Sequence, residues 1–241
     1  YLLGNSYDRS NFDRDLPLSM SFPFSNWSAS MRLRIVTVPP KFHVHAKNGP
    51  FWEYIAKNVG ARQARGKFLL FCNVDDIFPR SMMSWIAKGN LLETRAYRSG
   101  RVTIPVGQHG MDGVCDRVST GKGLCTASKI CVQTESFPGV TEVSITPLGD
   151  FTIFGRKLFL KTKGWSEIPQ AKHVDTGYVN WFTRTYKQVP WVYMDDVICH
   201  QDHSRGRVHA SVSPQAISRL HPQKEFGLPN ATLTQSISDS L

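Results

Sequence analysis

Two spacings of apolar residues along the chain predict its helices and buried strands. Apolar residues recur at intervals of four within residues 49–65, and this spacing predicts a helix. The continuous apolar run at residues 68–72 follows a glycine and predicts a fully buried strand. After Pro79, the sequence of residues 80–97 predicts a second helix.

The rest of the chain shows weaker versions of the same patterns. We expect strands at residues 1–7 and 31–40, the second ended by two prolines. Residues 98–147 are rich in glycine and predict a long loop or flap. A strand with a short helix, a longer helix and a last strand are expected at residues 149–165, 173–186 and 189–200.

The order of helix, buried strand, acidic turn and helix is typical of an α/β fold. Open α/β sheets bind ligands beyond the carboxyl ends of their strands. Asp75 and Asp76 fall at that position, directly after the strand at residues 68–72. The predicted fold class is therefore α/β, with a mixed sheet flanked by helices and a ligand site near these two acids.

The charge balance points to an anionic partner. The 241 residues include 29 Lys and Arg against 19 Asp and Glu, which gives a net charge of +10. Nucleic acid is disfavoured, because the basic residues are dispersed and no recognition helix is evident. No Walker-type glycine loop is present, which disfavours a phosphotransferase. No apolar segment reaches about 18 residues, so membrane association would need a segment outside this sequence.

The five cysteines match none of the usual zinc-site spacings. Cys72 and Cys199 lie in apolar, strand-like runs and are expected to be buried free thiols. Cys115, Cys125 and Cys131 lie in the glycine-rich region, where one disulfide would require an oxidising compartment. Both a lumenal, Golgi-type location and a cytoplasmic one remain compatible with the sequence.

The adjacent acids Asp75 and Asp76 suit a divalent cation bound to a diphosphate. Such a cation takes a few hard oxygen ligands and leaves its other positions to phosphate and water. A buried strand would fix the two carboxylates, and the turn after it would leave them accessible. The alternative is a helix cap, in which one carboxylate accepts hydrogen bonds at the start of the next helix.

The segment "NVGARQARGKFLLFCNVDDIFP" resembles family 2-like glycosyltransferases of the GT-A fold, which read roughly N-x-G-x-x-x-ARG, an apolar strand, D-x-D-D and Pro. The resemblance implies a Mn²⁺ or Mg²⁺ ion held on the diphosphate of a nucleotide sugar. Asp75 would be the main metal ligand and Asp76 a second acid. Asn73 stands where the family usually has a ribose-contacting Asp, and it brings no charge. The helix before the strand would add donor-side residues Asn58, Arg62 and Arg65.

A second block, "GDFTIFGRKLFLKTKGWSEIP", resembles the acceptor-side segment of the same family. Trp165 and Glu167 then fall in the acceptor-binding turn, although an aromatic residue at the end of a helix also suits a core position. In "HVDTGY", Asp175 matches the acid that serves as catalytic base, with helix capping as its alternative. Asp150 is the second candidate for the base, or for a contact with one of the sugars.

The resemblance extends to "ICHQDHSRGR" near the end of the last strand. His200 or His203 would complete the metal site, although both can also hydrogen-bond locally. Arg205 and Arg207 would help to neutralise the diphosphate.

Taken together, the resemblance implies a metal-dependent glycosyltransferase that transfers a sugar from a nucleotide-diphosphate donor to an acceptor hydroxyl, with inversion. The acceptor would be a glycan, protein or lipid. The catalytic domain would span residues 1–214 without the family's first strand, with Asp8 near the nucleobase, and residues 215–241 would be a peripheral tail. The competing interpretation is a degenerate, non-catalytic domain that binds glycan or nucleotide.

Overall fold

The structure is a computed structural model of the 241-residue chain. It describes residues 33–42, 53–73, 75–104, 120–125, 131–132, 142–144, 151–167, 174–201, 225–231, 233 and 235–238. The strand predicted at residues 1–7 lies outside these ranges.

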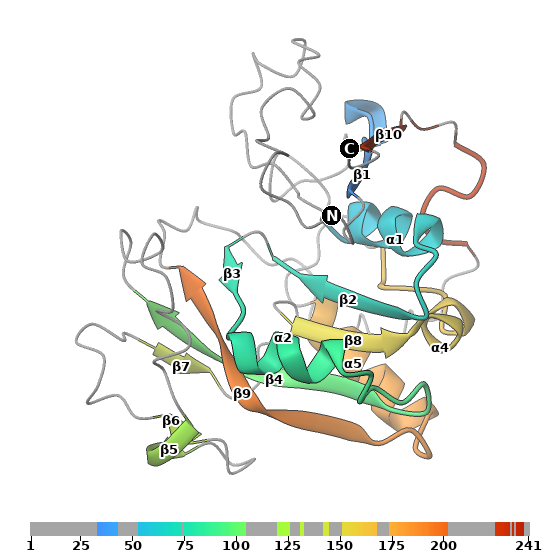
Figure 1. Ribbon diagram of the computed structural model, residues 1–241. Helices are drawn as coiled ribbons and strands as arrows, with labels where there is room; N and C mark the ends of the chain where they lie inside the picture. Colours follow the sequence, from blue (N-terminus) through green and yellow to red (C-terminus); the bar gives the residue numbers. More distant parts are fainter. Residues whose placement is uncertain are drawn as a thin grey trace.

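A six-stranded mixed sheet forms the centre of the molecule (Figure 1). Five strands follow one another in the order β2-β8-β4-β9-β3, and β7 (Glu142–Ser144) pairs with β4. Their bounds are β2 (Phe68–Cys72), β8 (Phe151–Gly155), β4 (Ala96–Ile104), β9 (Trp191–Gln201) and β3 (Asp76–Ile77). Because β2 and β4 both run antiparallel to β8, and β4 runs parallel to β9, the strands β2, β4 and β9 share one direction.

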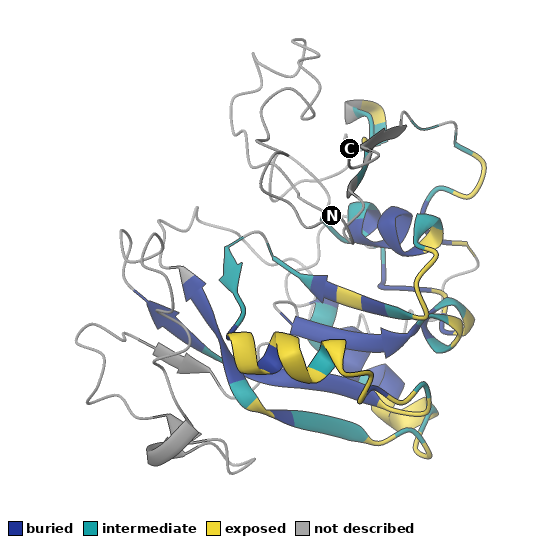
Figure 2. Cartoon of the chain, in the orientation of Figure 1, coloured by how far each residue is buried: buried dark blue, intermediate teal, exposed yellow. Residues whose placement is uncertain are grey.

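Helices cover both faces of this sheet. On one face, α1 (Glu53–Gln63), α4 (Arg156–Lys161) and α5 (Val174–Thr185) contribute to a large aromatic core around Phe154 and Trp165. On the other face, α2 (Arg80–Ala87) contributes Met82 to a smaller core that includes Ile153. Figure 2 shows α2 with an exposed outer surface. The α/β fold class predicted from the sequence is thus confirmed.

Alternating side-chain directions along β8 explain how one strand supports both cores. All five residues of β8 are buried, and successive side chains of a strand point to opposite faces. Phe151 and Ile153 belong to the core beneath α2, whereas Phe154 belongs to the core beneath α1, α4 and α5. Although β8 includes the polar residue Thr152, burial of all its positions marks a strand enclosed between two layers of helices.

The described ranges confirm several predicted elements and correct two. Predicted helices at 49–65 and 173–186 appear as α1 and α5, and the strand at 68–72 is β2. The helix predicted over residues 80–97 ends at Ala87, because the chain turns at Gly89 with a φ of 78°. Residues 96–104, most of them predicted to be a loop, form the nine-residue strand β4. Polar residues in its middle obscured the apolar pattern.

Two small sheets lie outside the central one. In the first, β1 (Leu33–Val36) pairs antiparallel with β10 (Gln235–Ser238). The single-turn helix η4 (Pro40–Phe42) comes after β1 in the chain. In the second, β5 (Thr120–Cys125) pairs with β6 (Cys131–Val132). The tail predicted to be peripheral is therefore part of the fold at residues 225–238. Phe226 is buried in the main core, and β10 completes a sheet with the N-terminal strand.

The structure also corrects the prediction for one cysteine. Cys199 of β9 is disulfide-bonded, although its apolar surroundings predicted a free thiol, whereas Cys72 is free as expected. Disulfides of this kind are typical of proteins in oxidising compartments. Within the described ranges, no helix has the length and apolar character needed to cross a membrane.

Reduction should therefore destabilise the protein. One disulfide uses two of the five cysteines, so the denatured, unreduced chain should expose at most three reactive thiols. A reductant should lower the free energy of unfolding by about 2–4 kcal/mol, measured by urea titration. The shift should persist in Cys72→Ser, which loses a free thiol, and shrink in Cys199→Ser. An unchanged shift in Cys199→Ser would contradict the assignment.

Candidate metal centre

Strand pairing brings together residues that lie far apart in the sequence. After β2 the chain turns through Asp75 into the short strand β3, which pairs antiparallel with β9. In this register Asp76 lies opposite His200, 124 residues further along the chain. The result is a cluster of Asp75, Asp76 and His200 in which one ligand atom of each residue lies within 4.8 Å of the others.

The spacing of the cluster suits a single metal ion. The Nδ1 atom of His200 lies 3.5 Å from Oδ1 of Asp75 and 3.4 Å from Oδ1 of Asp76. Ligands at about 2.1 Å from a hexacoordinate ion are roughly 3 Å apart when adjacent and roughly 4.2 Å apart when opposite. The observed separations fall in this range, so an ion could contact all three residues after small movements of the side chains.

Burial favours a compensating positive charge at this cluster. The side chain of Asp76 is 0% exposed, that of His200 is 6% exposed and that of Asp75 is 20% exposed. A buried carboxylate is costly unless charges or hydrogen bonds compensate it. Oδ2 of Asp76 accepts a hydrogen bond from the backbone N–H of Asn73 at 2.8 Å, which fixes this carboxylate in the turn.

The donor set favours one class of metal. Carboxylate oxygens suit Mg²⁺ and Mn²⁺, whereas an imidazole nitrogen suits transition metals. The three residues together therefore fit Mn²⁺ better than Mg²⁺. Because Asp75 keeps some exposure, the ion's remaining positions would face an accessible side, as a site that binds substrate requires.

A lysine that the sequence analysis did not single out lies next to the acidic turn. Lys57 of α1 donates a hydrogen bond to Oδ1 of Asn73 at 2.9 Å and pairs with Glu53 at 2.5 Å. Its side chain is almost completely buried, so its charge acts on Asn73 in a setting shielded from water. The signal for it in the sequence was its place one residue before Asn58, on the helix that leads to the strand.

The side chain of Asn58, expected to bind the donor, makes hydrogen bonds to a turn of the protein itself. It is 0% exposed, and its amide nitrogen donates to the backbone oxygen of Trp165 at 2.7 Å and to Oε1 of Glu167 at 2.8 Å. Its oxygen accepts the N–H of Trp165 at 2.8 Å. Asn58 thus connects α1 to the turn at residues 164–167 through three hydrogen bonds.

The two predicted acceptor-side residues also have roles inside the protein. Trp165 is 1% exposed, and its ring lies 4.5 Å from that of Tyr178 and 5.3 Å from that of Phe71. The structure therefore places Trp165 in the core, the alternative considered for it. Oε1 of Glu167 accepts the N–H of Gly227 at 2.6 Å as well as the bond from Asn58. Burial raises the pKa of Glu167, and these hydrogen bonds partly oppose the shift.

Two arginines expected on the donor side lie at the opposite end of β2. Arg62 lines a hollow together with Arg156, which follows the end of β8. The end of β8 is paired with Phe68, the first residue of β2, whereas Asp75 follows the last. Arg62 and Arg65 are therefore not the charges that compensate the acidic turn, because α1 presents its other end, with Lys57, to that turn.

Asp175 lies in the first turn of α5. A short connection at residues 186–190 joins α5 to the start of β9, and α5 runs against the direction of β9 (Figure 1). The N-terminus of α5 thus points towards the end of the sheet where His200 lies. A carboxylate in the first turn also stabilises a helix through its dipole, so this position fits both roles considered for Asp175.

The remaining predicted site residues lie outside the described ranges: Asp8, Asp150, His203, Arg205 and Arg207. No family model matches this sequence, and no curated protein matches it either.

The link made by Asn58 should be important for stability. In Asn58→Ala the N–H of Trp165 and the carboxylate of Glu167 lose buried partners. A buried hydrogen-bonding group left unsatisfied costs about 1–3 kcal/mol, and Glu167 keeps the bond from Gly227. Asn90→Ala is a matched control, because Asn90 makes one exposed bond, to the backbone oxygen of Trp85. Urea unfolding should show a loss of at least about 2 kcal/mol for Asn58→Ala and little change for the control. Equal losses would contradict the role given to Asn58.

Proposed function

We propose that this protein is a metal-dependent glycosyltransferase of the GT-A type, with a nucleotide-diphosphate sugar as donor. One observation carries the proposal. Two acids that follow a buried strand meet a histidine from a distant strand, at the carboxyl ends of three strands that share a direction. This is the end of an α/β sheet at which ligands bind. The resemblance of residues 58–79 to family 2-like transferases supplies the identity of the donor.

Each residue at the acidic turn would have its own role in binding the donor. Asp75, Asp76 and His200 would hold the ion, and Asn73 stands at the position of the family's ribose-contacting Asp. The bound ion would act as a Lewis acid on the diphosphate that leaves the sugar. Asp76, fully buried and bonded to the backbone, is the rigid ligand, and Asp75 is the more accessible one.

The proton of the acceptor hydroxyl needs a separate base. Inverting transfer requires a carboxylate on the acceptor side, which takes this proton as the oxygen attacks the anomeric carbon. Asp175 is our candidate, because the direction of α5 turns its first residues towards the metal end of the sheet. Its place on a helix that packs Tyr178 and Phe182 into the core would give the base a rigid support.

A second function is favoured by one contact. Oδ1 of Asn73 accepts a hydrogen bond from Lys57, so the residue at the ribose-contacting position has a partner inside the protein. Such an arrangement suits a degenerate domain that binds a glycan or a nucleotide without catalysis. A requirement for metal separates the two functions, since only the transferase needs the ion for donor binding.

Calorimetric titration of UDP and GDP, with and without Mn²⁺, tests the proposal. Binding should require Mn²⁺ and should weaken by at least about tenfold in Asp75→Ala, which corresponds to about 1.4 kcal/mol. Asp195→Ala is a matched control, since it removes an exposed acid from β9 and should leave binding unchanged. Equal binding with and without the ion would favour the non-catalytic alternative. No binding of either nucleotide would count against a UDP- or GDP-dependent transferase.

The same titration separates the base from the metal ligands. Asp175→Asn should bind the nucleotide and Mn²⁺ as the wild type does, because the amide preserves shape and the residue lies outside the cluster. Transfer should fall by at least about 100-fold, the usual contribution of a general base. Normal turnover of a nucleotide sugar by Asp175→Asn would exclude this residue as the base.

A further inference from the structure

A basic hollow lies at the end of β2 opposite the metal cluster. It has a volume of about 290 Å³ and is lined by Arg62, Arg156, Leu160, Lys163 and Phe226. These residues come from the last turn of α1, from α4 and the turn after it, and from the segment at residues 225–231. Small-molecule sites usually span about 300–1,000 Å³, so the hollow suits a small group.

The hollow is separate from the proposed donor site. Arg156 follows Gly155, which pairs with the first residue of β2, and the acidic turn follows the last residue of β2. Five residues of strand place the two sites about 15 Å apart along the sheet. A ligand of the hollow would therefore not contact Asp75, Asp76 or His200.

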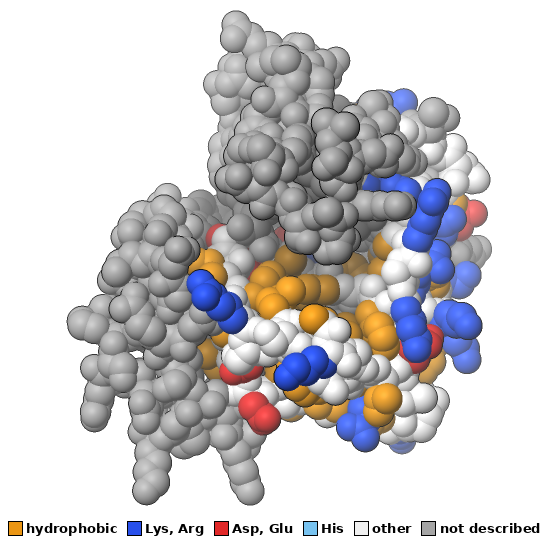
Figure 3. Space-filling view, in the orientation of Figure 1, with side chains coloured by type: hydrophobic (Ala, Val, Ile, Leu, Met, Phe, Trp, Pro, Cys, Tyr) orange, Lys and Arg blue, Asp and Glu red, His pale blue; other side chains and the backbone are white. Residues whose placement is uncertain are grey.

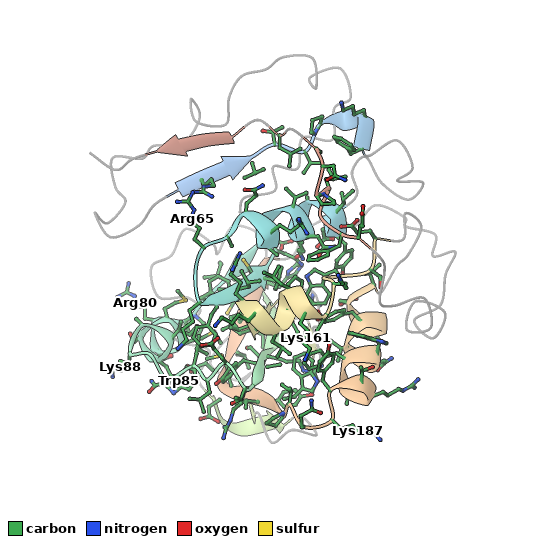
Figure 4. The ribbon with its side chains drawn as sticks, turned by 90° about the vertical axis from the view of Figure 1, so that its right-hand side faces the viewer. Arg65, Arg80, Trp85, Lys88, Lys161 and Lys187 are labelled. Carbon is green, nitrogen blue, oxygen red and sulfur yellow. The ribbon has the colours of Figure 1, made fainter. Side chains whose placement is uncertain are left out.

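Positive charge dominates this side of the molecule. Three of the five residues that line the hollow are cations and none is an acid. Figure 3 shows Lys and Arg side chains gathered along this edge, and Figure 4 shows Arg65 at the end of α1 and Lys161 on α4 on the same side. The nearby carboxylate of Glu167 already accepts hydrogen bonds from Asn58 and Gly227, so it offsets only part of this charge.

The cations are held in place before any ligand arrives. The guanidinium of Arg62 lies over the ring of Phe226, 5.3 Å from its centre, which is the geometry of a cation–π contact. Gly227 has a φ of 64°, and a Cβ atom there would lie only 2.6 Å from Cδ of Arg62. The absence of a side chain at Gly227 therefore lets Arg62 lie close against this segment.

Arg156 contributes a donor that needs an acceptor. Its backbone N–H donates to the oxygen of Lys67 at 2.9 Å, which anchors the start of α4 beside β2. Its Nε atom is buried, and among the described residues it has no hydrogen-bond partner. Buried polar atoms are normally satisfied, so this donor indicates an acceptor supplied from outside the described part of the protein.

We propose that this hollow binds a phosphate group carried by an organic molecule. A phosphate monoester brings a charge of about −1.5 to −2, which matches three cations better than a single carboxylate does. Arginine donates to phosphate through two parallel N–H groups, and two arginines line the hollow. The side chains of Leu160 and Phe226 provide an apolar wall for the carbon atoms next to the phosphate.

Two kinds of molecule carry such a phosphate group: a soluble phosphate ester and an acidic lipid with a phosphate head group. Glycerol 3-phosphate, titrated calorimetrically into the full chain with a metal chelator present, probes the first. Vesicles of phosphatidic acid and phosphatidylcholine, compared with phosphatidylcholine alone in a sedimentation assay, probe the second. The chelator makes the result independent of the metal cluster, so a failure here says nothing about the proposed transferase.

Charge-neutralising variants decide the outcome. Arg62→Gln and Arg156→Gln should each weaken binding of the probe by about 10- to 100-fold, the range for a lost charge-assisted bond. Lys187→Gln removes the same charge from an exposed position after α5 and should leave binding unchanged. Arg62 is exposed, so its variant should fold even if Arg156→Gln does not. No binding of either probe, or an equal loss in Lys187→Gln, would overturn the proposal.

Discussion

A fully buried carboxylate is costly unless charges or hydrogen bonds compensate it, and the candidate site is arranged around this constraint at Asp76. The backbone N–H of Asn73 donates a hydrogen bond to this carboxylate and brings no net charge. His200 lies 3.4 Å away because β3 pairs with β9 in a single register. With Asp75 beside them, two acids face one imidazole, and a divalent cation balances such a group better than a proton on the histidine does.

Much of the surrounding structure keeps this cluster in place. Phe71 of β2 packs edge-on against Trp165, with ring centres 5.3 Å apart, so the strand that carries the acidic turn is bound to the aromatic core. Asn58 connects the same core to α1 through Trp165 and Glu167. Lys57, the residue before Asn58 on that helix, donates a hydrogen bond to Asn73 beside the acidic turn. The two ends of this strand thus differ in charge, acidic beyond Cys72 and basic before Phe68.

The sequence predicts those features that depend on neighbouring residues. The apolar run at residues 68–72 and the two acids after it predict a buried strand and a ligand site at its end, and the strand lies where it was expected. No pattern of neighbouring residues indicates which strands pair across the sheet. The contact between Asp76 and His200 therefore became evident only in the structure. The same holds for Phe226, which is buried although it stands between Glu225 and Gly227 and belongs to no apolar run. The polar residues in the middle of β4 concealed its strand pattern. The position of Arg62 could not be predicted, because it depends on which end of α1 faces the acidic turn.

Pulsed electron paramagnetic resonance of the protein with Mn²⁺ tests the central claim most directly. One tightly bound ion should show coupling to a single imidazole nitrogen, because His200 would be the nitrogen ligand of the cluster. In His200→Ala the nitrogen coupling should disappear, and Asp76→Ala should weaken binding of the ion itself. A bound ion that keeps the nitrogen coupling in His200→Ala, or the absence of any tightly bound ion, would contradict the account.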